Sequence, residues 1–448
     1  MNEQFSGKSG DFELTPIPTH RATLDISFII AKALGYFTYD RPFLHLRIFN
    51  FVCLIVNWSI GLAYCLSNVA DIIVNYNNLD YVSNNLGYLA PMITTFAKVF
   101  TLYLSQDRIK RLIEKVHSPI KVLKFSSDTG VLTNICTAIF YQNFDYCLFN
   151  GVTISVTYVT FFAIPRGENE LPLRGTFPFD VSEFPLHQLA YFIQIYTIYV
   201  GCIWVLVFDT TVLGLIRWIY VQLIILKSNY RHCSVESYAR SNFTVTPEVY
   251  NKILDYNWFT LDKEKESEIH TFVAFTKEEA YVEKDSHALR LKTCLKHHQR
   301  LILNVDECND TFSAVLFGMI AANFFLVCLN LFLAVLCMRD PVKFFRYLVM
   351  MGTGLLHLLF WCLFGNELMK QGESIYRSIY ESRWEEHLHN RQIKQYMVNA
   401  LLIGLKPLTI SAGTFFIFSM DTYLSVIQKS YSYFAILNTV IDKEEYDV

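Results

Sequence analysis

The chain has 448 residues, of which 52% are hydrophobic, 16% aromatic and only 18% charged. That charged fraction is low beside the roughly 25% typical of soluble domains, and a net charge of −3 does not fit a nucleic-acid-binding protein, which should be basic. Several apolar runs of about 18 or more residues predict an all-α integral membrane protein, embedded in a lipid bilayer.

The sequence carries no motif typical of catalysis or metal binding. None of the 11 cysteines stands in a Cys-x-x-Cys or Cys/His zinc spacing, so no disulfide framework, metal site or cofactor is predicted. His297 and His298 are adjacent, so they point apart on a helix and favour a structural role. Nucleophile-elbow, zincin, phosphate-loop and paired-carboxylate motifs are missing, so we do not expect an enzyme.

The N-terminal half is predicted to contain four membrane spans. Residues 1–47 lack the pattern of a cleaved signal peptide and are expected to form a cytosolic segment. Residues 48–216 follow as transmembrane helices 1–4, centred on 48–70, 81–105, 146–164 and 188–216. A basic inner loop, 106–130, separates the second and third spans. A proline- and acid-rich outer loop, 165–187, separates the third and fourth and could fold over an opening as a lid.

The C-terminal half is predicted to contain three more spans. Residues 217–310 form a cytosolic loop with helix extensions, and 311–365 hold the fifth and sixth spans. Residues 366–406 show apolar positions at helical intervals and predict one amphipathic cytosolic helix, ended by Lys406-Pro407. The seventh span is expected over 407–441, with 442–448 as an extracellular tail.

The distribution of Lys and Arg predicts the orientation. These residues are concentrated in the segments 1–47, 106–130, 217–309 and 366–406, and sparse in the intervening loops. Because cytoplasmic loops carry the excess of positive charge, the N-terminus should be inside and the C-terminus outside after seven crossings. Lys98 lies near the inner end of its span, where its side chain could snorkel to the interface.

The seventh predicted span carries a polar stripe. At about 100° per residue, one arc roughly 100° wide holds Asp421, Ser425, Gln428, Lys429, Ser432, Ile436 and Thr439. Such a stripe on a membrane helix indicates either the lining of a water-filled path or helix packing through polar side chains. The residues of the stripe alone leave both interpretations open.

Three segments resemble the insect odorant receptor family. The run SAGTFFIFSMDTYLSVIQKSYSYFAIL spans 411–437, CLKHHQRLILNVDECNDTFSAVLF spans 294–317, and GNELMKQGESIYRSIYESRW spans 365–384. The long 217–309 loop is more typical of the family's co-receptor, whereas the C-terminal motif is typical of an odour-tuning subunit, which we favour.

The resemblance implies a function. Members of that family are odorant-gated, non-selective cation channels that assemble as tetramers with co-receptor subunits in the plasma membrane of sensory-neuron dendrites. The last helix lines the pore, so Ser432, Ile436 and Thr439 match pore-facing positions, with Ile436 as the apolar gate. The stripe adds Asp421, Ser425 and Gln428 to the predicted pore, although Lys429 would need a partner such as Asp421 or a neighbouring subunit.

The resemblance also implies a pocket for a small volatile hydrophobic ligand and an assembly surface. The pocket is expected in the outer half of the bundle, where candidates are Tyr88, Met92, Ser155, Tyr158, Phe162, Tyr191, Gln194, Phe324 and Phe325. For each residue alone, core packing is the simpler interpretation. The cytosolic linker is expected to anchor neighbouring subunits, through Ile379, Trp384, Ile393 and Met397.

Two alternatives stay open at this stage. A gustatory receptor would share the channel architecture, although the SYSYF segment at 430–434 favours an odorant receptor. A secondary transporter commonly shows inverted repeats with broken helices in both halves, and here only the break near Pro407 is evident.

Overall fold

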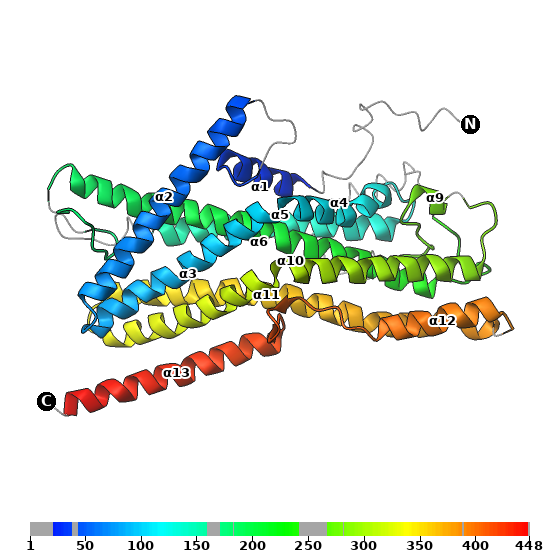
Figure 1. The fold of residues 1–448 in the computed structure, drawn as a ribbon. Helices are drawn as coiled ribbons and strands as arrows, with labels where there is room; N and C mark the ends of the chain where they lie inside the picture. Colours follow the sequence, from blue (N-terminus) through cyan, green and yellow to red (C-terminus); the bar gives the residue numbers. More distant parts are fainter. Residues whose placement is uncertain are drawn as a thin grey trace.

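The computed structural model describes residues 21–37, 44–158, 171–181, 183–241, 267–280, 282–387 and 389–446. Within these ranges the chain is mostly helical, as predicted. The molecule is an elongated bundle whose longest helices run lengthwise (Figure 1). Its helices in the first half are α1 (Ala22–Ala33), α2 (Leu44–Val74), α3 (Leu79–Leu104), α4 (Gln106–Leu123), α5 (Thr129–Tyr158) and α6 (Leu186–Arg231).

The second half is built around one long helix. Its elements are α9 (Lys277–Ala280), α10 (His287–Leu336), α11 (Pro341–Tyr380), the 3-10 turn η3 (Trp384–His387), α12 (Arg391–Gly404), β1 (Ser411–Ala412), β2 (Phe416–Ile417) and α13 (Met420–Tyr446). Helix α10 is buried along most of its length and packs most extensively against α3 and α11. Ser286 begins this helix by accepting a hydrogen bond from the Leu289 amide at 3.3 Å.

Of the described helices, four are long and apolar enough to cross a membrane: α2, α6, α10 and α11. The other three predicted spans correspond to α3, α5 and α13, which carry more polar residues. Helix α3 holds Asn84, Asn85 and Lys98, and α13 holds Asp421 and Lys429. These groups lower the mean hydropathy of their helices, so composition by itself does not identify them as spans.

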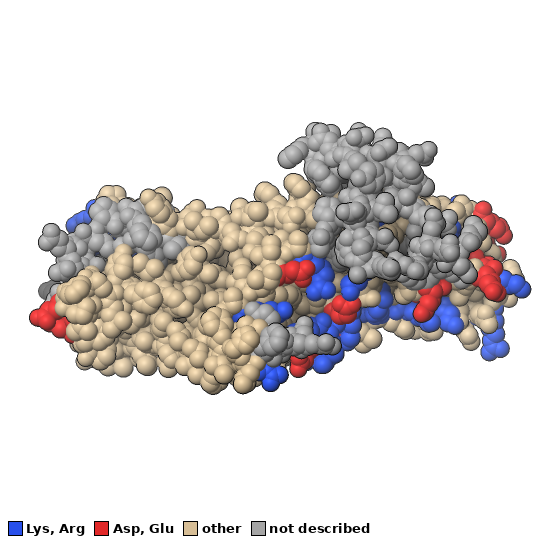
Figure 2. All heavy atoms as spheres, turned by 90° about the horizontal axis from the view of Figure 1, so that it is seen from above, with Lys and Arg blue, Asp and Glu red and all other residues tan. Residues whose placement is uncertain are grey.

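On the face seen in Figure 2, charged side chains gather over one half of the molecule's length. This half contains α4, α9 and α12, and we call it the charged half. On the same face the surface of the other half is mainly uncharged, and we call that half the apolar half. Helices α6, α10 and α11 extend through both, whereas α2, α3 and α13 belong to the apolar half (Figure 1). This division is the one that a bilayer around the apolar half would produce.

The predicted basic loop 106–130 is mostly a helix. Residues Gln106–Leu123 form α4, whose apolar side includes Ile109, Leu112 and Val116, all fully buried. Their spacing of three and four residues places them on one face, and the basic residues lie on the other. The prediction of a loop overlooked this amphipathic period.

The predicted single helix over 366–406 is instead a helical hairpin. Helix α11 continues without a break to Tyr380, and the chain then turns at Arg383, whose φ is 55°. After η3, Asn390 starts α12 by accepting a hydrogen bond from the Gln392 amide at 2.9 Å. The helical period continues on both sides of the turn, so the sequence pattern could not reveal it.

The last helix was predicted to start at residue 407. This start is wrong, because α13 begins at Met420. The intervening residues form the β1–β2 hairpin, in which Ser411 pairs with Ile417. The side chain of Asn309 on α10 holds the entry to this hairpin, since it accepts from the Ser411 amide at 2.9 Å and donates to the Thr409 carbonyl at 2.8 Å. These bonds compete with helix formation for the same backbone groups.

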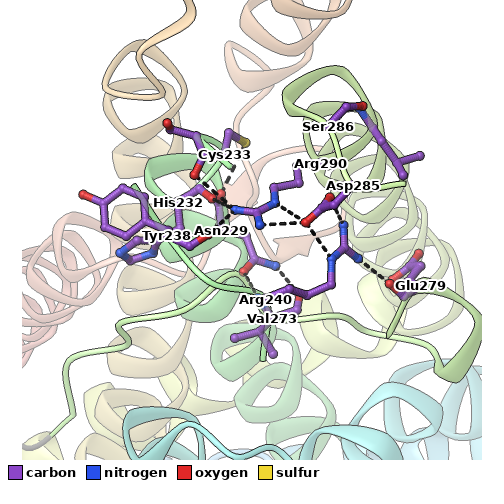
Figure 3. Close-up of polar contacts among 12 residues, drawn as sticks. Asn229, His232, Cys233, Tyr238, Arg240, Val273, Glu279, Asp285, Ser286 and Arg290 are labelled. Carbon is purple, nitrogen blue, oxygen red and sulfur yellow. Dashed lines mark hydrogen bonds and ion pairs between the residues drawn. The ribbon is translucent and has the colours of Figure 1, made fainter. Parts of the chain in front are cut away.

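A buried ionic network joins segments of the charged half (Figure 3). Arg290 is 2% exposed; it donates to Asp285 and to the backbone carbonyls of His232, Ser234 and Tyr238 at 2.9–3.2 Å. Arg240 donates to the other oxygen of Asp285 at 2.6 Å. Burial alone would raise the pKa of Asp285, but these hydrogen bonds outweigh it and hold the pKa below its ordinary value.

Replacing Arg290 with Met should therefore destabilise the fold. The substitution leaves three carbonyls without their donor and Asp285 with one cation, and breaking a buried ion pair typically costs about 3 kcal/mol or more. The melting temperature of the purified protein measures this loss. Lys292→Met, two residues along the same helix and exposed, is the matched control and should leave melting nearly unchanged. An equal effect of both variants would contradict the structural role of Arg290.

Candidate ligand cavity and the last helix

Two adjoining cavities lie among the helices of the apolar half, lined by α2, α3, α5, α6, α10 and α11. We call the first, about 240 Å³, the lid-side compartment; it is lined by Tyr64, Asn84, Tyr88 and Met92 among others. The second, about 410 Å³, is the deep compartment and extends toward the charged half. Residues shared by both compartments are Pro91, Thr95, Thr153, Cys202, Val205 and Leu326. Mostly apolar walls with few polar groups are typical of small-molecule sites.

The described part of the predicted outer loop is docked on the helices beside the lid-side compartment. Asp71 on α2 is 4% exposed and accepts hydrogen bonds from Asn85 at 2.6 Å and Thr176 at 3.0 Å. Arg174 of the loop lies 3.4 Å from Asp71 and stacks over the ring of Tyr81. The backbone of Thr176 also donates to α2, at the carbonyl of residue 67.

Gln194 on α6 provides a second attachment for the loop. Its side-chain amide exchanges two hydrogen bonds with the backbone of Leu173, at 3.0 Å and 2.8 Å. The Leu173 side chain is 2% exposed and belongs to the same buried cluster as Tyr64 and Met92. Gln194 was predicted to line the pocket, and the structure places it at the base of the loop instead.

Three helices meet beside the deep compartment at a triad formed by one buried ion pair and a histidine. Lys98 on α3 and Asp209 on α6 lie 2.8 Å apart and are 2% and 1% exposed. His357 on α11 contacts the other Asp209 oxygen at 2.6 Å. The suggestion that Lys98 snorkels to the membrane interface is therefore wrong, because its ammonium group finds a counter-charge inside the bundle.

The predicted pocket residues are distributed over several surfaces. Tyr88 and Met92 line the lid-side compartment. Ser155 and Tyr158 are exposed on α5, Phe325 is exposed on α10, and Phe324 lies 6.2 Å from Tyr433 of α13 by ring centroids. Tyr191 lines a separate open hollow on α6, and Phe162 lies outside the described residues.

On α13 the polar stripe faces away from the rest of the chain. Asp421, Gln428, Lys429, Ser432 and Ile436 are exposed and Ser425 is half-buried; Thr439 lies further along the same helix. Val426 and Ser430 are buried against the bundle. At about 100° per residue these two positions fall on the side opposite the stripe.

Neither Asp421 nor Lys429 forms an ion pair with another described residue. The two are eight residues apart, which on a helix separates them by about 12 Å along the axis. Pairing between them is therefore excluded within one chain. Any ion-pair partner of Lys429 lies outside the described residues.

A close backbone contact joins α11 to the segment before α13. Gly365 packs so near Phe418 that an added Cβ would lie 2.3 Å from the Phe418 carbonyl oxygen. The rings of Trp361 and Phe418 are 5.4 Å apart on the same junction. Since α11 also lines the deep compartment through His357 and Gly354, one continuous helix connects the cavity wall to the base of α13.

Gly365→Ala should separate this junction. The methyl group has no room beside the Phe418 carbonyl, and such overpacking typically costs about 1–3 kcal/mol. We expect a lower melting temperature for the purified protein. Gly352→Ala on the same helix is the matched control, because nothing lies within 4 Å of the added Cβ. Equal melting temperatures for the two variants would contradict close packing between Gly365 and Phe418.

Comparison with known proteins decides the family. The family model described as 7tm Odorant receptor matches residues 78–431, which is most of the chain. The chain belongs to the odorant receptor family. The family predicted from residues 294–317, 365–384 and 411–437 is thereby confirmed. Odorant receptors are membrane receptors, in agreement with the apolar helices found here.

Relatives of this receptor are found in Drosophila melanogaster. It is 29% identical to Odorant receptor 65a over 147 residues, a match that covers 33% of this chain and 35% of that protein. With Odorant receptor 47b it shares 21% identity over 372 residues, covering 80% and 78% of the two chains. The match to Odorant receptor coreceptor is 23% over 147 residues. The matches to Odorant receptor 65a and Putative odorant receptor 65c span only about a third of the length of each of these relatives.

The fold of the receptor resembles solved structures of the olfactory receptor OR5 from Machilis hrabei. The likeness to OR5 in complex with eugenol has a TM-score of 0.68 at 12% identity, covering 94% of this chain and 97% of that one. A second structure of OR5 gives a TM-score of 0.69. At this identity the likeness shows a shared fold.

The predicted assembly residues of the receptor are mostly internal. Ile379, Ile393 and Met397 are 0–3% exposed and pack within the chain, whereas Trp384 is half-buried. The histidines of the 297–298 pair also separate: His297 stacks on Phe275, and His298 packs on Tyr230.

Sequence reasoning about the receptor missed the triad of Lys98, Asp209 and His357. Lys98 was recognised as a charge inside a span, but no partner for it within the bundle was predicted. A signal was available, because two opposite charges in different spans of one bundle are expected to pair. Identifying the pair needs the register of α3 against α6, which the sequence does not give.

Proposed function

We propose that this receptor is a subunit of an odorant-gated, non-selective cation channel. The observation that carries the proposal is the geometry of α13. Its polar stripe points away from the subunit's own bundle, opposite Val426 and Ser430. Placed around a symmetry axis, such helices would line a path with hydroxyl and carboxylate groups that tolerate hydrated cations, and Ile436 would form an apolar constriction.

The proposed membrane arrangement has seven crossings, by α2, α3, α5, α6, α10, α11 and α13. The charged half would lie in the cytosol, since it contains the basic segments of the chain. The docked loop and its lid-side compartment would then face the outside. Ligand would enter a cavity sheltered by this loop and lined by spans two to six.

Gating follows from the connection between the cavity and α13. A ligand shifts the channel toward the open state by binding that state more tightly. A ligand in the deep compartment contacts α11, whose Gly365 and Trp361 pack on Phe418 at the base of α13. Movement of α11 would displace α13 through this contact and withdraw Ile436 from the axis.

Assembly is proposed to be tetrameric, with co-receptor subunits, in the plasma membrane of sensory-neuron dendrites. Because most of the predicted anchor residues are buried within the chain, we propose a different surface for the contact between subunits. Exposed apolar side chains on α11 and α12 in the charged half include Tyr380, Val398, Leu402 and Leu405, which are 56–65% exposed. An apolar surface of this kind in a water-facing region is typical of an assembly interface.

The test is expression of the receptor with and without co-receptor subunits, with currents recorded against a panel of volatile odorants. We expect odorant-evoked cation current when both are present. Single-channel steps distinguish a channel from a saturable transporter. Odorant-evoked uptake without steps, or no response to any odorant despite surface expression, would overturn the proposal.

A further inference from the structure

The deep compartment has one polar wall in otherwise apolar surroundings. Lys98, Asn323 and His357 line it from three different helices, α3, α10 and α11. Behind them, Asp209 is 1% exposed and does not itself line the cavity. A charged cluster of this kind is costly in a membrane protein and is expected to serve a function.

The hydrogen bonds define the charge state of the cluster. The amide nitrogen of Asn323 can only donate, and it lies 3.3 Å from Nδ1 of His357, so Nδ1 accepts. The proton of the imidazole is then on Nε2, which donates to Asp209 at 2.6 Å. With a neutral His357, the ammonium of Lys98 and the carboxylate of Asp209 compensate each other, and the cluster has no net charge.

Lys98 retains unused hydrogen-bonding capacity. An ammonium group has three N–H donors, and among the described residues Lys98 makes one hydrogen bond, to Asp209 at 2.8 Å. Its other neighbour is the ring of Phe208, whose centroid lies 5.1 Å from Nζ. The side chain is 2% exposed and lines the deep compartment, so its other two donors have little access to bulk water. Buried donors without acceptors are unfavourable, and an acceptor supplied by a ligand would relieve that cost.

We infer that the deep compartment binds neutral ligands through a carbonyl oxygen, such as that of a ketone or an ester, with Lys98 as the donor that determines this specificity. The inference rests on the proposed function and names the ligand class of the same cavity. The carbonyl oxygen accepts from Nζ, and the hydrocarbon chain of the ligand occupies the apolar walls formed by α5, α6 and α10.

The cluster discriminates against other head groups for electrostatic reasons. A carboxylate would add a negative charge beside a cluster that is already compensated, and its desolvation would not be offset. An alkylammonium ion would meet the Lys98 ammonium. A hydrocarbon would leave the Lys98 donors unsatisfied. Ketones and esters satisfy the donors without adding charge.

The test uses four probes of equal carbon number: decane, methyl octyl ketone, decanoic acid and decylamine. On receptor co-expressed with the co-receptor, we expect the ketone to activate at a concentration lower than decane by about tenfold or more, the range of one charge-assisted hydrogen bond. The acid and the amine should be weaker than the ketone. A ketone no more potent than decane would overturn the inference.

The variant Lys98→Met/Asp209→Asn removes the donor and keeps the net charge at zero. It should abolish the advantage of the ketone over decane, because neither probe then meets a buried ammonium donor. Val205→Ala, which changes an apolar residue of both compartments, is the matched control and should weaken all four probes while the ketone keeps its advantage. Survival of the ketone preference in the double variant would overturn the inference.

A binding measurement on the wild-type protein does not depend on any variant or on channel activity. Methyl octyl ketone should raise the melting temperature of the purified receptor more than decane at equal concentration. Equal shifts would overturn the inference even if currents are observed. Conversely, the ketone could give the larger shift in a receptor that shows no odorant-evoked current. That result would support the binding site and count against the proposed channel function, so the two failures are distinguishable.

Discussion

Ile436→Ser should raise the basal current of the assembled channel. If Ile436 seals the closed pore, the seal depends on apolar side chains that exclude water at the constriction. Burying an isoleucine contributes about 1.5 kcal/mol or more, so its loss should shift the closed–open equilibrium by roughly tenfold. Whole-cell current in the absence of odorant, normalised to surface expression, measures the effect.

Tyr431→Ser is the matched control for this substitution. Tyr431 is 66% exposed on the same helix, and Ile436 is 59% exposed. The two are five residues apart and therefore point about 140° away from each other. Basal current should rise only with the change at 436. An equal rise with both, or with neither, would remove Ile436 from the gate.

Asp209→Leu should strongly destabilise the receptor. The substitution leaves Lys98 without a counter-charge and His357 without the acceptor of its Nε2 proton. Leaving one charge of a buried pair uncompensated typically costs about 3 kcal/mol or more. Lys98→Met combined with Asp209→Leu should recover much of this loss, because no isolated charge remains. Melting temperatures of the purified single and double variants measure the coupling.

An exposed ion pair in the same chain provides the control. Lys406 and Asp306 lie 2.7 Å apart, but both side chains are about half exposed. Exposed pairs contribute roughly 0–1 kcal/mol, so Asp306→Leu should change melting very little. If Asp209→Leu were equally mild, or the double variant no more stable than the single one, the pairing of Lys98 with Asp209 would not hold α3 and α6 together.

The sequence predicted the helical class and the family, and it predicted least about contacts between distant segments. The α11–α12 turn at Arg383 interrupts a helical period that continues on both sides, so periodicity could not locate it. The hairpin before α13 depends on Asn309, which lies about a hundred residues earlier in the chain. Local propensity carries no information about such a partner.

In the candidate site, too, residues close in sequence were predicted and contacts between distant helices were not. The stripe on α13 could be read from helical spacing because its members are close in sequence. Tyr88 and Met92 were identified from their position on one span. In contrast, the role of Gln194 in holding Leu173, and the pairing of Lys98 with Asp209, depend on how three helices are placed side by side. That placement is a tertiary property and requires the structure.

In the proposed channel, one face of α13 lines the water-filled path. Cysteine accessibility tests it with two neighbouring serines: Ser432 is exposed on the stripe, and Ser430 is 1% exposed on the opposite side. A charged, membrane-impermeant thiol reagent applied during odorant-evoked current should block channels that carry Ser432→Cys. It should leave Ser430→Cys and the wild type, with its own 11 cysteines, unaffected. Block at 430 and not at 432, or at neither position, would contradict the claim that this face of α13 forms the pore.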